Sequence, residues 1–229
     1  MSSAIRRRSG HLHTARDTYV RDGRTVILQG VCHVADAQFW KQLNGYLMRA
    51  EEVGFAVHFE GVTSDMEDPP NIFVDLGGLA SFLGLESQKT GLVYRPHWTR
   101  TDIPLSELVA GMSPETLAKM VDSTGKMNEF LSSMDGHDQR RLIGSLIRRV
   151  MAFGLALPKA GPFAVGIKDP IILDRRNEVA ARAAMEAEGD VVALWGAAHL
   201  PGIGDLLGDA GFRRVEQQWT PVMKVARPR

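Results

Sequence analysis

Three short apolar runs, each followed by glycine or polar residues, predict buried strands. They are rich in β-branched and aromatic side chains and are apolar at almost every position. Such runs are typical of strands covered on both faces, as in parallel sheets. A further pair of strands near the C-terminus is predicted on either side of Thr220 and Pro221. The expected strands cover residues 25–30, 55–60, 191–195, 212–219 and 222–226.

Apolar residues at steps of three and four predict helices between these strands. The clearest helix begins near residue 35, buries Phe39, Trp40, Leu43 and Leu47 on one stripe, and ends before Gly54. In the middle of the chain, Ser113 and Pro114 have the residue types of an N-cap and a first helical position. The pattern of residues 92–103 is ambiguous and is compatible with short strands. Helices are expected over residues 35–53, 76–85, 104–112, from 113 onward, and over 138–157, 169–188 and 201–210.

Strands at both ends of the chain enclose a helical middle. Alternating strands and helices indicate an α/β protein with a mixed, mainly parallel sheet, flanked by helices and interrupted by a helical insertion. The length of 229 residues suits one large domain. We therefore expect a single domain over residues 1–229.

The composition is that of an ordinary globular protein, and it excludes several classes of function. Lys and Arg total 27, as do Asp and Glu, so the chain lacks the basic surplus of a protein that binds nucleic acid or an anionic membrane surface. Cys32 is the only cysteine, which excludes a disulfide framework and a cysteine-based zinc site. With no apolar run of membrane-spanning length and no secretory signal, we expect a cytoplasmic protein.

Two Gly-x-x-His motifs occupy equivalent positions in the predicted fold. Gly30 to His33 and Gly196 to His199 each begin at the end of a buried strand and lead into a helix. Glycine permits a sharp turn there, and ligands of open α/β sheets bind outside the carboxyl ends of the strands. Glu60 ends a third strand in the same way. If these strands are neighbours, two imidazoles and one carboxylate converge.

Two kinds of chemistry fit this convergence, and a plain structural role fits it as well. His33, His199 and Glu60 are suitable ligands for a divalent metal such as Mn, Co or Zn, with open positions for water. They equally suit a metal-free general base, a histidine oriented by a carboxylate. A lone Gly-x-x-His is common by chance. Alternation along the strand puts His58 on the same face as Glu60, where it can support the site.

Arg176 and Asn177 lie on the helix expected over residues 169–188. Arg176 shares an inward stripe with Val179, Ala180 and Ala183, whereas Arg175 points to solvent. An inward arginine binds a carboxylate, a phosphate or a developing oxyanion. Here it either acts on the substrate or pairs with Glu60, and Asn177 either positions substrate or caps a loop.

The sequence resembles the TraB/PrgY/GumN family, which includes the Tiki proteases and belongs to a wider superfamily with the ChaN haem-binding and erythromycin-esterase folds. The two Gly-x-x-His motifs, the glutamate between them, the Arg-Asn pair and the Leu-Pro-Gly-Ile that follows His199 all match its hallmarks. The resemblance implies a metal-dependent, peptidase-like hydrolase. Many members have a signal peptide or a membrane anchor, and this sequence departs from them. The matching segments are residues 26–33, 57–62, 172–180, 194–203 and 211–212.

The leading hypothesis is therefore a hydrolase that acts on an amide or ester of a small molecule or peptide. The alternatives are a protein that binds peptide or haem without turnover, and a metal-free esterase or biosynthetic enzyme. Nucleic acid and membranes are not expected as partners, and self-association into a homo-oligomer is left open. Cys32 is expected to be a packed thiol, not a nucleophile. The candidate catalytic residues are His33, Glu60, Arg176 and His199, the metal ligands His33, Glu60 and His199, and the substrate-binding residues Asn177, Gly30 and Gly196.

Overall fold

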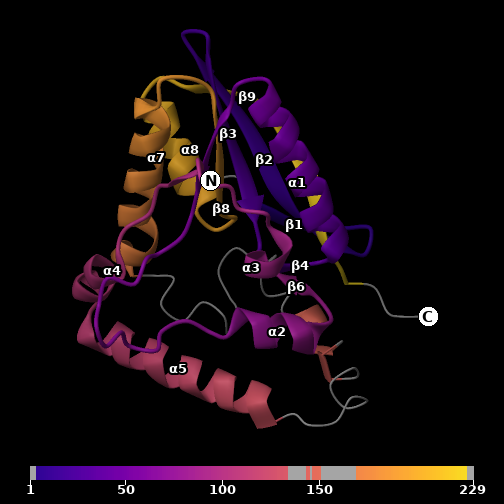
Figure 1. The fold of residues 1–229 in the computed structure, drawn as a ribbon, viewed down its shortest axis with the longest axis vertical. Coiled ribbons are helices and arrows are strands. Elements are labelled where there is room, and N and C mark those ends of the chain that lie inside the picture. The colour runs from indigo at the N-terminus through magenta and orange to yellow at the C-terminus, as the bar shows by residue number, and fades with distance from the viewer. Residues whose placement is uncertain (1–3, 134–142, 145, 151–168, 226–229) are drawn as a thin grey trace.

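The computed structural model describes residues 4–133, 143–144, 146–150 and 169–225. A seven-stranded sheet within these residues has the order β1-β2-β3-β8-β5-β7, and β9 pairs with β2 (Figure 1). The neighbouring strands β3, β8, β5 and β7 run parallel, whereas β1, β2 and β9 pair antiparallel. The expected α/β class with a mixed sheet is confirmed. The strands are β1 (Ile5–Arg8), β2 (His11–Arg21), β3 (Arg24–Val31), β5 (Ala56–Phe59), β7 (Thr99–Arg100), β8 (Val191–Gly196) and β9 (Arg213–Lys224).

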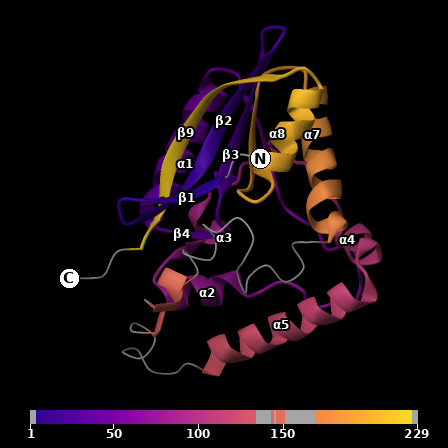
Figure 2. The same ribbon diagram turned by 180° about the vertical axis from the view of Figure 1, so that it is seen from behind.

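Helices cover both faces of the sheet (Figures 1 and 2). Helix α1 (Ala37–Glu52) packs Phe39 and Trp40 against the face that presents Val192 and Leu194 of β8. Helices α7 (Arg176–Glu186) and α8 (Leu200–Asp209) cover the opposite face. All six residues of β8 are buried, as expected for a strand between two helical layers.

The helical middle lies beyond the carboxyl ends of the parallel strands (Figures 1 and 2). A two-stranded sheet of β4 (Val34–Ala35) and β6 (Glu86–Ser87) joins it to the end of β3. Of the helix expected over residues 138–157, positions 143, 144 and 146–150 are helical, and the rest lie outside the described residues. The helices of this region are α2 (Leu76–Leu83), α3 (Gln88–Gly91), α4 (Leu105–Gly111) and α5 (Pro114–Ser133).

The antiparallel strands differ from the sequence analysis in two ways: one hairpin was not predicted, and the prediction of two closing strands is wrong. The N-terminal hairpin of β1 and β2 was not expected, because β2 buries polar Thr14 and Asp17 among its inward residues. The two predicted closing strands form one continuous strand, β9. Proline is tolerated at position 221 because, among the described strands, β9 pairs only with β2 and its register shifts at that point.

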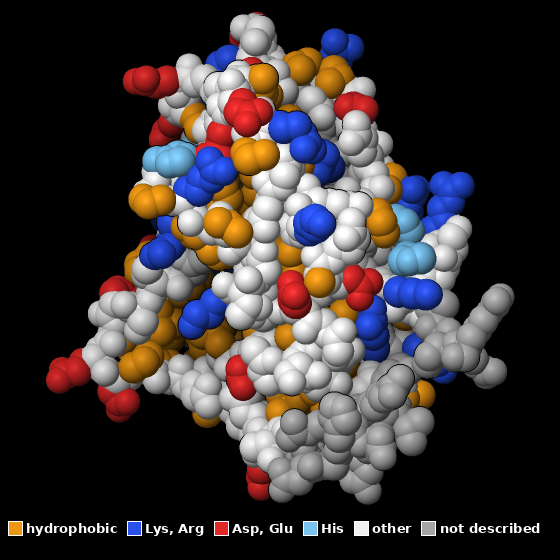
Figure 3. All heavy atoms as spheres, turned by 45° about the vertical axis from the view of Figure 1, so that its right-hand side comes forward, with side chains coloured by type: hydrophobic (Ala, Val, Ile, Leu, Met, Phe, Trp, Pro, Cys, Tyr) orange, Lys and Arg blue, Asp and Glu red, His pale blue; other side chains and the backbone are white. Residues whose placement is uncertain are grey.

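The surface bears charges of both signs. On the face shown in Figure 3, acidic and basic side chains are interspersed with hydrophobic ones, in keeping with the balanced composition. None of the helices in the described part of the chain is both long enough and apolar enough to cross a membrane.

Gly30 owes its identity to packing between the sheet and α8. A β-carbon at this position would lie 2.9 Å from the carbonyl oxygen of Ala15 and 3.1 Å from Cδ2 of Leu200. The backbone oxygen cannot move away without disturbing the β2–β3 region. Glycine at position 30 therefore allows the side chain of Leu200, the residue directly after His199, to pack close to the backbone of β3.

We predict that Gly30→Ala lowers the free energy of unfolding by about 1–3 kcal/mol, the usual cost of overpacking a core. Gly125→Ala is the matched control, since none of the described atoms lies within 4 Å of a β-carbon there. Gly125 is in α5, so alanine should stabilise the protein by up to about 1 kcal/mol. Urea denaturation of both variants measures the difference. Equal effects at the two positions would contradict the packing argument.

Candidate functional site

Three predicted residues surround Gly196 at the carboxyl end of β8. A β-carbon on Gly196 would lie 3.0 Å from Oε2 of Glu60, 3.6 Å from Cδ2 of His199 and 3.7 Å from Nε2 of His33. In addition, Nε2 of His199 is 3.7 Å from Oε1 of Glu60. The ends of β3, β5 and β8 thus bring the two histidines and the carboxylate to one point. Only glycine leaves that point open.

Glu60 is a buried carboxylate with both oxygens engaged. Gly196 donates its backbone N–H to Oε2 at 2.5 Å, and Nη2 of Arg176 donates to Oε1 at 2.6 Å. Burial alone would raise the pKa of this carboxyl, but the nearby side chains of His33 and Arg176 outweigh it and hold the pKa at about 2. Glu60 is therefore a fixed negative charge at neutral pH.

Arg176 is held between Glu60 and a second carboxylate, Asp102, which the sequence analysis missed. Its Nε and Nη2 donate to the two oxygens of Asp102 at 2.9 and 2.7 Å, and the Asp102 side chain is fully buried. Although burial opposes a charge, the two carboxylates raise the pKa of Arg176. The sequence analysis left open whether Arg176 acts on the substrate or pairs with Glu60, and the structure shows the pairing with Glu60.

The buried face of α7 differs slightly from the predicted stripe. A π-helical segment, η2 (Ile171–Arg175), precedes α7. Val179 is only half-buried, whereas Asn177 is buried beside Arg176. Both functional side chains thus face inward. The buried residues of α7 are Arg176, Asn177, Ala180, Ala181 and Ala184.

The contacts of His199 define its protonation state. Nη1 of Arg176 lies 3.3 Å from Nε2, and since a guanidinium only donates, Nε2 accepts. The proton is then on Nδ1, which lies 2.7 Å from Oδ1 of Asn177 and donates to it. Burial lowers the pKa of His199 to about 4. His199 is therefore a neutral ring oriented by Asn177.

His33 is oriented by a chain of polar side chains that the sequence analysis did not predict. Nδ1 of His33 is 2.9 Å from Oε1 of Gln88, whose Nε2 donates to the Tyr94 hydroxyl at 3.0 Å. The amide orientation makes Nδ1 the donor, and Nε2 faces Gly196. The backbone N–H of Gln88 also donates to the carbonyl of His33 at 2.7 Å. His33 is exposed, so this imidazole is the accessible one of the two.

Other candidate residues lie outside this group. Cys32 packs between two apolar clusters, and burial raises the pKa of its thiol to about 12, which disfavours a thiolate nucleophile. Gly30 packs against Leu200, so its surroundings give no support to substrate binding. Nδ1 of His58 is buried without a hydrogen-bond partner among the described residues. Arg175 pairs with Glu107 near the surface.

The side chains as arranged do not fit a divalent metal. The guanidinium of Arg176 donates to Oε1 of Glu60 and to Nε2 of His199, two of the atoms that could otherwise bind an ion. A permanent cation at that position repels a second one. Within the described ranges, no set of three or more His, Cys, Asp or Glu side chains is placed to hold a metal.

Comparison with protein-family models, with curated proteins and with solved structures finds no match to this chain. The resemblance to TraB/PrgY/GumN proteins accordingly remains a prediction, based on the motifs alone.

We predict that acid destabilises the protein through His199. Its pKa falls from the ordinary 6.5 to about 4 on folding, so the unfolded chain binds more protons between these values. The contribution of His199 to the free energy of unfolding is fully present above pH 6.5. It is lost as the pH falls toward 4, with a slope of up to about 1.4 kcal/mol per pH unit. Glu60, with its pKa lowered to about 2, adds a second loss below pH 4.5.

Urea denaturation at a series of pH values measures this slope. His199→Gln removes the titrating ring and should flatten the slope between pH 6.5 and 4. His97→Gln alters an exposed histidine and should leave that slope in place. An unchanged slope in His199→Gln would contradict the assignment.

Proposed function

We propose that the protein is a metal-free hydrolase that cleaves an ester or amide bond, with His33 as the general base. The observation behind the proposal is the arrangement round Gly196. The exposed imidazole of His33, through its Nε2, and the ionised carboxylate of Glu60 face the same point. A water molecule at that point would contact Nε2 of His33 and Oε2 of Glu60.

The reaction would proceed by direct attack of water. Nε2 of His33 takes a proton from the water as its oxygen bonds to the carbonyl carbon, and the carbonyl electrons move to oxygen. As the tetrahedral intermediate collapses, the protonated His33 returns the proton to the leaving oxygen or nitrogen. Glu60 stabilises the imidazolium, and Gln88 accepts the Nδ1–H throughout.

Arg176 has a mainly positioning role in this proposal. Four of its five N–H groups are directed at Asp102, Glu60 and His199, as the hydrogen bonds show. The remaining N–H on Nη1 is the one available to a carbonyl oxygen that becomes negative. The arginine thus fixes Glu60 and His199 first and offers a single donor to the transition state.

The site does not define the substrate more closely than an ester or amide. We propose a small molecule or peptide that reaches the point above Gly196 from the exposed side of His33. A cytoplasmic location is part of the proposal, because a reducing compartment suits a chain with the single thiol Cys32.

The proposal predicts that His33→Ala lowers kcat/KM by about 10²- to 10⁴-fold, the usual contribution of a general base. Cys32→Ser should retain activity, because the Cys32 thiol is packed and protonated. A panel of chromogenic aryl esters and peptide anilides supplies the assay, and a thermal melt confirms that each variant is folded. Activity should also survive dialysis against EDTA.

Three other results of this assay would each favour a different class of function. Activity that is lost with EDTA and restored by Mn²⁺, Co²⁺ or Zn²⁺ would overturn the metal-free mechanism and favour a metal-dependent hydrolase. Activity that is lost only in Cys32→Ser would favour a thiol nucleophile. A folded wild-type protein without turnover on any substrate of the panel would favour a binding protein.

A further inference from the structure

Two glycines lie side by side where β5 and β8 end. The parallel register pairs Phe59 with Leu194, and the backbone N–H of Glu60 donates to the carbonyl of Leu194. The same register, continued by two positions, places Gly61 beside Gly196. Neighbouring strands are about 4.8 Å apart, and residues in parallel register face the same side of the sheet. The two glycines therefore form a strip of backbone without side chains.

A different polar group stands at each end of this glycine strip. Nε2 of His33 is 3.7 Å from the position that a β-carbon on Gly196 would take. At the equivalent position on Gly61, the nearest atom is Nε of Arg100, at 3.4 Å. The imidazole proposed as general base and a guanidinium thus lie one strand apart on the same face.

Aromatic side chains lie along the strip. Cε2 of Phe59 is 3.6 Å from the β-carbon position of Gly61, and the rings of Phe59 and Tyr94 meet edge to face with centroids 5.1 Å apart. Burial raises the pKa of Tyr94, and the smaller, opposite effects of Glu60 and Arg100 place both of these charges near its hydroxyl. Tyr94 is 40% exposed, so part of this aromatic surface is open to a ligand.

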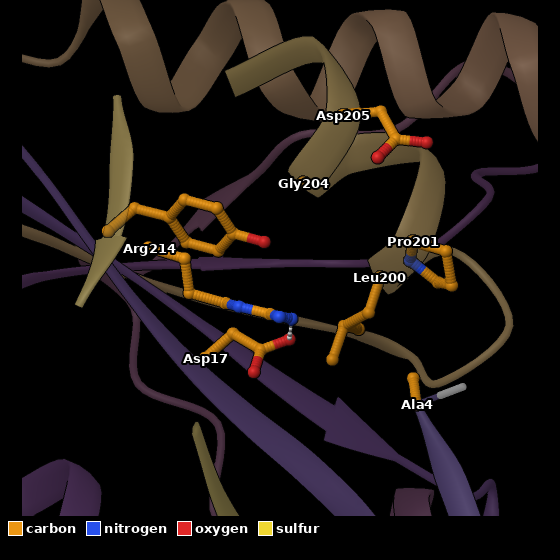
Figure 4. A pocket seen from close by; sticks show the side chains of 8 residues that line it. Ala4, Asp17, Leu200, Pro201, Gly204, Asp205 and Arg214 are labelled. Atoms are coloured by element: carbon orange, nitrogen blue, oxygen red, sulfur yellow. Dashed lines mark ion pairs between the residues drawn. The ribbon is translucent and has the colours of Figure 1, made fainter. Parts of the chain in front are cut away.

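The charge of Arg100 is not neutralised within the described part of the chain. Other exposed arginines differ in this respect. In the recess over β2 and β9, Nη1 of Arg214 pairs with Oδ2 of Asp17 at 3.8 Å (Figure 4). Arg100 is exposed as well, but among the described residues its guanidinium contacts only the Phe59 ring, 5.7 Å from the ring centre. Its N–H groups are therefore available to an anion.

We propose that Arg100 binds the carboxylate of an N-acyl amino acid whose acyl carbon lies above Gly196. This inference rests on the hydrolase proposed for that site. One strand spacing and the 3.4 Å contact together give a reach on the order of 8 Å from Gly196 to the guanidinium. The scissile amide, the α-carbon and a carboxylate hydrogen-bonded to an arginine span such a length.

The neighbouring charges favour a carboxylate over a phosphate. Glu60 directly precedes Gly61, and Oδ2 of Asp102 accepts the backbone N–H of Gly61 at 3.0 Å. Both groups repel a dianion more strongly than a monoanion. A single carboxylate also matches the planar fork of one arginine. In the reaction, water oxygen bonds to the acyl carbon, the C–N bond breaks, and the nitrogen takes the proton from His33 as the free amino acid leaves.

Proton–nitrogen NMR of the full chain, titrated with N-acetyl-L-phenylalanine at constant ionic strength and pH 7, tests the proposal. We expect saturable shifts of the backbone amides of Gly61 and Gly196, with a Kd on the order of 1–10 mM. N-acetyl-L-phenylalanine amide has the same groups but no carboxylate, and should bind at least 10-fold more weakly. Equal affinity for the two compounds, or no saturable shift with either, would overturn the proposal.

Variants locate the carboxylate contact. Arg100→Gln should weaken the binding of N-acetyl-L-phenylalanine at least 10-fold and leave the affinity for the amide unchanged. Arg182→Gln, which alters an exposed arginine on α7, is the matched control and should bind as the wild type does. A thermal melt confirms that both variants are folded. Undiminished affinity of Arg100→Gln for the acid would overturn the proposal.

Failure of this inference and failure of the hydrolase give different results. The methyl proton signal of released acetate reports turnover in the same samples. Binding that depends on Arg100, without acetate, would support the carboxylate site and contradict the hydrolase. Equal acetate release from the acid and the amide, with equal binding, would overturn the carboxylate site and leave the hydrolase standing.

Discussion

One buried guanidinium holds the candidate site together. Arg176 joins α7 to carboxylates that follow two different strands, Glu60 after β5 and Asp102 after β7, and also contacts His199. Removing one member of such a group leaves an unpaired buried charge, which typically costs about 3–5 kcal/mol. The side chains of His33 and Arg176 keep Glu60 ionised, whereas burial keeps His199 neutral. The ion pairs of Arg176 with Glu60 and Asp102 therefore fix the charged groups beside the proposed site.

Much of the parallel part of the fold was predictable, because strands covered on both faces have continuous apolar sequences. Residues 25–30 and 191–195 became β3 and β8 with small changes at their ends. The antiparallel part was not predictable in the same way. Strand β2 buries Thr14 and Asp17, so its inward positions do not read as apolar. Strand β9 contains Pro221, which only the tertiary position of an edge strand tolerates.

The site was predictable where a functional residue lies within three residues of the end of a strand with a clear apolar pattern. His33, Glu60 and His199 were found in this way. Asp102 follows a strand too, but β7 has only two residues and leaves no hydrophobic pattern. Gln88 comes from the helical insertion, and its contact with His33 joins residues that are 55 positions apart. Local spacing contains no information about such pairs, so the orienting residues emerge only from the packed structure.

The central claim is that buried His199 is a neutral ring whose proton lies on Nδ1, because Arg176 donates to Nε2 and Asn177 accepts from Nδ1. Long-range proton–nitrogen NMR of the histidine side chains at pH 7 tests this most directly, with His199→Gln used to assign the His199 signal. The predicted result is a neutral ring with a protonated Nδ1 and an unprotonated Nε2. A doubly protonated ring, or a neutral ring with its proton on Nε2, would contradict the account.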